Sequence, residues 1–131
     1  GRAPNARIAG EVGVSEGTVR RRLRTLIQDG VIKVIAVPHL ERIGFPTTAL
    51  IGLQADPGAV DDVASALAAL PEVHYVAITT GAHDVFAWVA LGSSEELGAF
   101  LRSKVGTIKG VRRTETFVNL LIRKRTYGLI L

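Results

Sequence analysis

The chain has 131 residues, enough for one domain or two small ones, with 16 Lys/Arg against 12 Asp/Glu. It contains no cysteine, which excludes a disulfide framework and a cysteine-based metal site. Its longest uncharged apolar run, residues 43–55, spans 13 residues and includes a proline, whereas a membrane helix needs about 18 apolar residues. We therefore expect no membrane span and no signal segment, and the composition favours a cytoplasmic protein.

The positive charge is concentrated at the beginning of the chain. Residues 1–45 hold eight Lys/Arg and four Asp/Glu, whereas residues 46–131 hold eight of each. The whole excess of +4 therefore lies in the first third of the sequence. A localised positive field is what binding to phosphate groups requires, so this third is the candidate for a nucleic-acid contact.

The basic third predicts two short helices joined by a tight turn. A helix that Asn5 caps is expected to run through Val12, followed by a turn at Gly13 and a second helix that Ser15 caps and that ends near Asp29. Apolar residues recur in the second helix at helical spacing and predict a buried stripe: Val19, Leu23, Leu26 and Ile27. This layout is typical of a helix-turn-helix that binds duplex DNA.

Polar and basic residues occupy the opposite face of the second helix. Arginine suits a guanine edge, and hydroxyl groups suit either bases or phosphates. An ordinary solvated helix face is the alternative interpretation of the same arginines. Thr18, Arg21, Arg22 and Thr25 share the face opposite the apolar stripe, while Ser15 and Arg24 are better placed for phosphates.

A different pattern begins after a linker. Residues 31–37 predict a strand that completes residues 1–37 as the DNA-binding domain, and residues 38–46 form the linker, with a turn around Gly44. The order strand, helix, strand, strand, helix, strand then follows, at residues 47–54, 59–70, 73–80, 84–91, 94–105 and 111–121, before a basic and then apolar tail at 122–131. Two such strand-helix-strand units predict an α+β, ferredoxin-like βαββαβ domain over residues 47–131 with an antiparallel sheet.

All four expected strands carry apolar residues on alternating positions, and hardly any side of them is polar. Two helices cover only one face of such a sheet. The uncovered apolar face predicts a homodimer in which two sheets pack together.

A candidate ligand site lies in the turn between two of these strands. A glycine there lets a ligand approach backbone N–H groups, and Asp84 could pair with an α-amino group. An ordinary hairpin turn, in which the Asp84 carboxylate bonds backbone, is the alternative. The candidate effector residues are Thr80, Gly81, Ala82, His83 and Asp84 in the turn, with Thr114 and Thr116 two apart on the last strand.

Taken in order, several short segments resemble the leucine-responsive regulator/AsnC family, also called feast/famine regulators. They are Gly1-Arg2-Ala3-Pro4, Ile8-Ala9, Val14-Ser15, Thr18-Val19, Arg21-Arg22-Leu23-Arg24, Leu26, Gly30-Val31-Ile32, Thr80-Gly81-Ala82-His83-Asp84, Gly110-Val111 and Thr114-Glu115-Thr116. The resemblance implies a winged helix-turn-helix, a strand linker and a ligand-sensing domain. It also implies dimers that assemble into multiples of dimers, and amino-acid effectors bound between sensing domains near the glycine-to-aspartate loop.

The sequence departs from this family in two places. The usual first helix of the DNA-binding domain is expected to be missing, which leaves the winged helix-turn-helix incomplete. Ala82 and His83 stand where relatives often have an acidic or aromatic residue, so the effector is expected to differ.

Other functions are less well supported by the residues. His74 and His83 could share a metal across strands, but a surface histidine is the commoner case, and no metal or cofactor is expected. A small ferredoxin-like enzyme remains an alternative, although no triad, cysteine or phosphate-binding glycine loop supports it. A stand-alone amino-acid sensor without DNA binding is the other alternative.

Overall fold

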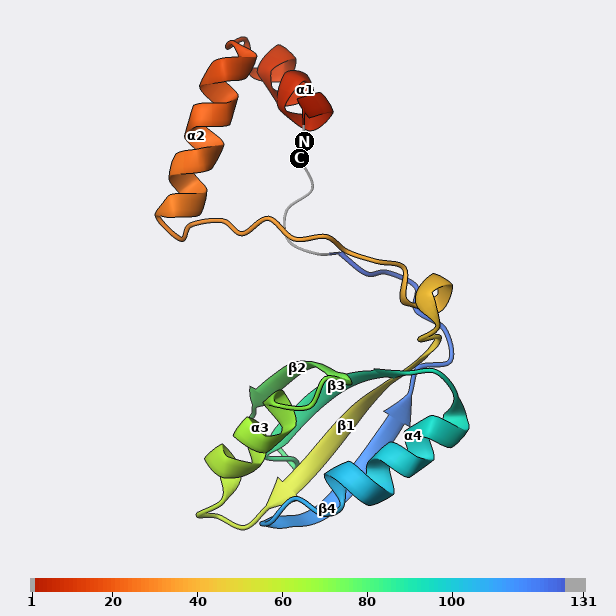
Figure 1. Cartoon of the computed structure of the whole chain (residues 1–131). Helices are drawn as coiled ribbons and strands as arrows, with labels where there is room; N and C mark the ends of the chain where they lie inside the picture. Colours follow the sequence, from red (N-terminus) through yellow and green to blue (C-terminus); the bar gives the residue numbers. More distant parts are fainter. Residues whose placement is uncertain (1, 127–131) are drawn as a thin grey trace. The chain divides into compact units, whose positions relative to one another are not determined.

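The structure is a computed structural model, and it describes residues 2–126. The chain divides into two compact units (Figure 1). The first unit comprises residues 1–37 and also takes in the chain from Lys124 onward, and the second comprises residues 38–123.

The first unit contains the two predicted helices. α1 (Arg2–Val12) begins before the expected cap, so Asn5 lies inside the helix, and α2 (Glu16–Gln28) follows after a turn. Gly13 has a φ of 71°, a left-handed conformation that favours glycine, and the N–H of Val14 donates to the carbonyl of Ala9 at 3.2 Å. The helix-turn-helix predicted from the sequence is confirmed.

The apolar stripe of α2 is only partly buried. Val19 is 5% exposed, Ala9 of the contacting helix α1 is also buried, and Leu23 is half-buried. Leu26 and Ile27 are 36% and 44% exposed, so the prediction that they are buried is wrong. In the described part of the chain, α1 is the helix that packs on α2, and it does not cover the last turns.

The segment after α2 is not the predicted strand. Residues 31–37 have no regular secondary structure, and Val31 and Val34 are more than two-thirds exposed. A strand forms only when a neighbour completes its hydrogen-bond ladder, and residues 2–126 supply none for this segment. In the linker, a short 3₁₀ helix η1 (Leu40–Ile43) replaces the expected turn and ends at Gly44, whose φ is 94°.

The second unit has the predicted ferredoxin-like fold. Its four strands pair antiparallel in the order β2-β3-β1-β4. The last strand ends three residues earlier than expected, and the second helix continues into a single π-helical turn. The elements are β1 (Thr47–Ala55), α3 (Val60–Ala68), β2 (Val73–Ile78), β3 (Val85–Leu91), α4 (Ser94–Phe100), η2 (Leu101–Val105) and β4 (Val111–Val118).

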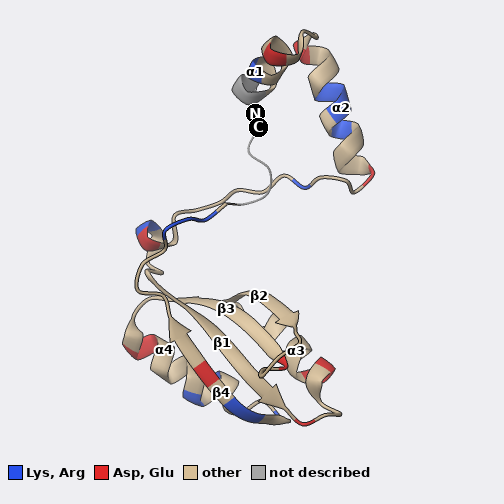
Figure 2. Ribbon diagram, turned by 180° about the vertical axis from the view of Figure 1, so that it is seen from behind, with Lys and Arg blue, Asp and Glu red and all other residues tan. Residues whose placement is uncertain are grey.

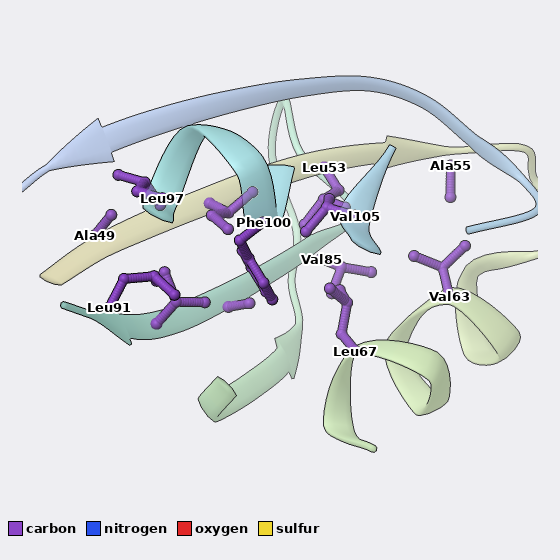
Figure 3. Packing of buried hydrophobic residues seen from close by; sticks show 13 residues of the cluster. Ala49, Leu53, Ala55, Val63, Leu67, Val85, Leu91, Leu97, Phe100 and Val105 are labelled. Atoms are coloured by element: carbon purple, nitrogen blue, oxygen red, sulfur yellow. The ribbon is translucent and has the colours of Figure 1, made fainter. Parts of the chain in front are cut away.

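Both helices cover the same face of the sheet, where the core lies (Figure 3). Alternate residues of β1 and β3 point toward the helices because side chains of a strand alternate between faces. They meet Val63 and Leu67 of α3 and Leu97 and Phe100 of α4. The predicted capping box holds the start of α4: the Ser93 hydroxyl accepts the N–H of Glu96 at 3.1 Å.

The other face of the sheet carries a row of large apolar side chains, one from each strand. The register aligns Tyr75 with Trp88, Trp88 with Leu50, and Leu50 with Phe117. Tyr75 is 60% exposed and Phe117 is 44% exposed, while Trp88 and Leu50 between them are half-buried. This face, called here the open face, is the uncovered apolar surface that the sequence predicted.

Candidate functional site

A chain of hydrogen bonds orders the exposed face of α2 from its first turn. The Ser15 hydroxyl accepts the N–H of Thr18 at 3.1 Å, and the two hydroxyl oxygens are 2.8 Å apart. The Arg21 guanidinium donates to the Thr18 hydroxyl at 3.2 Å. Because an oriented arginine loses less entropy on binding than a free one, these bonds prepare Arg21 for a contact.

The next turn of α2 forms a shallow, open depression. It has a volume of about 350 Å³ and is lined by Arg21, Arg22, Thr25 and Leu26. The Thr25 hydroxyl donates to the carbonyl of Arg21 at 3.1 Å, which holds its methyl group and oxygen in one orientation. Four of the six predicted DNA-binding residues, Thr18, Arg21, Arg22 and Thr25, therefore lie together.

The arginines of α2 differ in their electrostatic partners. Arg20 pairs with Glu16 one turn away at 3.5 Å. Within residues 2–126, no carboxylate lies at ion-pair distance from Arg21, Arg22 or Arg24. The basic band of α2 in Figure 2 is thus largely uncompensated and can attract an anionic partner.

Side chains that donate hydrogen bonds to the loop's carbonyl groups hold the loop between β2 and β3 in place. Gln54 donates its side-chain amide to the carbonyl of Ala82 at 3.0 Å, and the Thr79 hydroxyl donates to the carbonyl of His83 at 3.1 Å. Gly81 has a φ of 103°. The backbone N–H groups of residues 80–83 have no protein acceptor among the described residues, so they are free to donate to a ligand.

The carboxylate of Asp84 is bound to the sheet rather than to its own turn. Its Oδ2 accepts the N–H of Ala55 at 2.9 Å, and its own N–H donates to the carbonyl of Leu53 at 2.8 Å. The carboxylate therefore satisfies a backbone donor next to the bulge in β1. A ligand amino group could bind only to the lone pairs of the Asp84 carboxylate that the N–H of Ala55 does not use.

His83 crosses from the loop onto the open face and lies over Gly52. A Cβ atom at position 52 would be 2.8 Å from the imidazole ring, so glycine is required for this contact. The ring stands edge-on to Phe86 and Phe117, at centroid distances of 5.2 and 6.4 Å. Its Nε2 is 3.6 Å from a carboxylate oxygen of Glu115, and its buried Nδ1 has no hydrogen-bond partner within residues 2–126.

Thr114 and Thr116 lie on the other side of the sheet from His83. They pair with Leu53 and Ile51, two fully buried residues that face the helices. Directly paired residues share a face, so both threonines are on the helix-covered side. The structure brings the predicted loop residues together and separates them from these two.

Comparison with known proteins identifies the two units. Residues 48–129 match the Lrp/AsnC ligand binding domain, and residues 1–33 match a winged helix-turn-helix DNA-binding domain. The chain belongs to the Lrp/AsnC family. It is a transcriptional regulator with a DNA-binding and a ligand-binding domain, and the family resemblance inferred from the sequence is confirmed.

Relatives of this Lrp/AsnC protein are named as HTH-type transcriptional regulators. An uncharacterized HTH-type transcriptional regulator of Pyrococcus furiosus is 37% identical over 99% of the chain and 88% of that protein. The HTH-type transcriptional regulator FL11 of the same organism is 36% identical over 98% of the chain and 85% of its own length.

Solved structures of the family have the same fold. Escherichia coli AsnC superposes with a TM-score of 0.83 at 26% identity, over 94% of this chain and 84% of that one. A transcriptional regulator of Neisseria meningitidis, crystallised as a complex with L-Met, gives 0.87 at 22% identity over 96% and 84% of the two chains. Among residues 2–126, no helix of the regulator is long and apolar enough to cross a membrane.

Several residues of the loop site were not predicted from the sequence. Gly52, Gln54 and Glu115 are far from the loop in sequence and reach it through strand pairing. No local pattern marks them, because the register that aligns them becomes known only with the sheet. In the described part of the chain, no three His, Asp or Glu residues are grouped to hold a metal ion.

Proposed function

We propose that this Lrp/AsnC regulator reads duplex DNA through the exposed face of α2, and that an amino acid bound to its sheet unit changes its affinity for DNA. The observation that carries the DNA part is the ordered row of Thr18, Arg21, Arg22 and Thr25, whose arginines have no carboxylate partner among the described residues. Arg21 and Arg22 would contact base edges, and Ser15 and Arg24 would contact phosphates.

A single pair of variants tests the DNA-binding face. Arg22→Ala removes a side chain of the proposed surface, whereas Arg20→Ala removes the same charge beside the apolar stripe, where Arg20 pairs with Glu16. We expect Arg22→Ala to weaken binding of the target duplex by about 1–3 kcal/mol, and Arg20→Ala to have a smaller effect.

The measurement is fluorescence anisotropy with a labelled duplex over a series of salt concentrations. Equal effects of the two variants would mean that only net charge matters and that α2 does not read bases. Binding that is absent for the unmodified chain even at low salt would favour the stand-alone sensor instead.

The regulator would act as a homodimer, and as multiples of dimers, through the open face. Tyr75 and Phe117 are exposed at the two ends of the apolar row, and such a surface is stabilised when a second copy covers it. We expect the double variant Tyr75→Glu/Phe117→Glu to be monomeric by light scattering, while the exposed-surface control Lys109→Glu keeps the size of the unmodified protein. A double variant of unchanged size would place the interface elsewhere.

The loop at residues 80–84 would hold the amino-acid effector. Its unpaired N–H groups suit an α-carboxylate, and the acceptor capacity left on Asp84 suits an α-ammonium group. The complex of the Neisseria relative with L-Met supports this class of ligand. Thr114 and Thr116 lie across the sheet from His83, so for a ligand beside His83 they would have to come from a neighbouring copy.

The role of Asp84 calls for a variant that separates charge from structure. Asp84→Asn keeps an oxygen that can accept the N–H of Ala55 but removes the negative charge, whereas Asp84→Ala removes both. We expect Asp84→Asn to fold normally and to lose affinity for L-methionine, or for whichever L-amino acid binds the unmodified chain by calorimetry. Unchanged ligand affinity in Asp84→Asn would remove Asp84 from the effector site.

Coupling between the two units would be thermodynamic linkage. The regulator would exist as two or more oligomeric assemblies. An amino acid that binds more tightly to one of these assemblies raises its population. The affinity of the regulator for DNA would then change by about 1–3 kcal/mol, a typical coupling energy. Identical DNA affinity and assembly size with and without the bound amino acid would contradict this linkage.

A further inference from the structure

The basic end of the chain belongs to a different unit from the one that precedes it in sequence. Arg123, Lys124 and Arg125 follow β4 and lie inside the stretch that matches the ligand binding domain. The division of the structure nevertheless places the chain from Lys124 onward with residues 1–37, the unit that contains α1 and α2. The sequence alone would have assigned these charges to the sheet.

This arrangement increases the difference in charge between the units. The first unit holds nine Lys/Arg against three Asp/Glu, a net charge of +6, and the second holds seven against nine, a net charge of −2. Residues 1–37 alone contribute seven of those nine cations. The two from the tail therefore raise the unit's net charge from +4 to +6.

Two cations outside the helices, Lys33 and Lys124, are available to a partner. Lys33 and Lys124 are exposed, and no carboxylate among residues 2–126 forms an ion pair with either of them. Asn119, which directly follows β4, is bound to the sheet. The side-chain amide of Asn119 donates to the Thr48 hydroxyl at 3.0 Å, and its N–H donates to the Thr48 carbonyl at 2.9 Å.

We propose that Lys124 and Arg125 contact the DNA phosphate backbone together with α2, so that the end of the sheet domain forms part of the DNA-binding surface. This inference rests on the proposed DNA-binding function. Phosphate contacts are independent of base sequence, so the tail would add affinity and salt dependence without adding sequence preference.

The test compares two double variants with the same loss of charge. Lys124→Gln/Arg125→Gln removes the tail cations, and Lys109→Gln/Arg113→Gln removes one lysine and one arginine from the exposed surface of the sheet unit. Binding of a labelled mixed-sequence duplex is measured against salt concentration. We expect the slope of log K against log salt to fall by about 2 for the tail variant, and to stay that of the unmodified chain for the control.

A single variant guards against an effect on folding. Arg125 is half-buried, whereas Lys124 is exposed, so Lys124→Gln alone should lower the slope by about 1 and leave the melting temperature unchanged. Equal slopes for the tail variants and the unmodified chain would overturn the inference but leave the α2 proposal intact. If the control Lys109→Gln/Arg113→Gln lowered the salt slope equally, DNA binding would depend only on the total charge of the protein. Absence of salt-dependent binding by the unmodified chain would instead remove the proposed DNA-binding function.

Discussion

The two units of this regulator use their apolar residues in opposite ways. The sheet unit buries a core of thirteen residues between its helices and its sheet. In residues 5–37, only Ala9 and Val19 are buried among the apolar residues, and Leu26 and Ile27 are exposed. Since buried apolar area is the main source of stability, the sheet unit is rigid by its own packing, whereas the helical unit is expected to open more easily.

The largest expected effect tests this contrast in the core. Leu53→Ala removes a fully buried side chain of β1 and should destabilise the sheet unit by about 2–5 kcal/mol, because it leaves a cavity. Leu23 of α2 is only half-buried, so Leu23→Ala should lower the free energy of unfolding by clearly less. Urea unfolding followed by Trp88 fluorescence reports the first, and far-ultraviolet circular dichroism reports the second. Equal losses would show that the two units share one cooperative core.

The next effect concerns the contact between His83 and Gly52. Gly52→Ala brings a Cβ atom within 2.8 Å of the imidazole ring, and we expect a loss of about 1–2 kcal/mol as the ring is displaced from the open face. In a His83→Ala background the same substitution should cost little, because the clashing ring is gone. A double-mutant cycle in urea measures this coupling, and additive effects would mean that the backbone, not His83, resists the substitution.

A smaller effect is expected at the start of α2. Ser15→Ala removes the oxygen that accepts the N–H of Thr18, and loss of such a cap typically costs about 1 kcal/mol. Because Ser15 also bonds the hydroxyl of Thr18, the orientation of Arg21 should loosen as well. Amide hydrogen exchange in the first turn of α2 should accelerate. Ser15→Asp, which keeps an acceptor, serves as the control and should retain protection.

The smallest effect is a pH dependence in the sheet unit. Burial raises the pKa of Glu72, but hydrogen bonds and the charge of Lys104 outweigh it, so the pKa lies below its ordinary value of 4.5. A lowered pKa in the folded state stabilises the protein above the unfolded-state pKa, and this stability is lost as pH falls through the folded-state value. Glu72→Gln should therefore be less stable than the unmodified chain at neutral pH, with the difference shrinking below about pH 4.5. A difference that stays constant down to acid pH would contradict the ion pair.

Local patterns predicted most of the fold. Periodicity and turn residues identified both helices of the first unit and the order of elements in the sheet unit, with errors of a few residues at the ends. The strand expected at residues 31–37 was wrong, because alternating apolar residues reveal β-propensity but not whether a partner strand is present. The exposure of Leu26 was missed for the same reason, since burial depends on a neighbour.

The two candidate sites also differ in whether local sequence or contact with another element determines them. The face of α2 follows from helical periodicity alone, so the sequence is enough to predict which of its side chains lie together. The loop site depends on strand register, which places Glu115 beside His83 and sends Thr116 to the opposite face. No sequence spacing reveals which face each residue takes relative to the loop, because Glu115 and Thr116 pair with residues more than sixty positions away.

The order of the strands has a consequence for the behaviour of the protein in concentrated solution. β2 and β4 are the edges of the sheet. β4 carries Arg112, Arg113 and Glu115, and charged side chains on an edge discourage another strand from pairing there. β2 has no Lys, Arg, Asp or Glu, and its Ile78 is exposed. Aggregation on heating should therefore begin at β2, and a lysine in place of Ile78 is the substitution that should delay it.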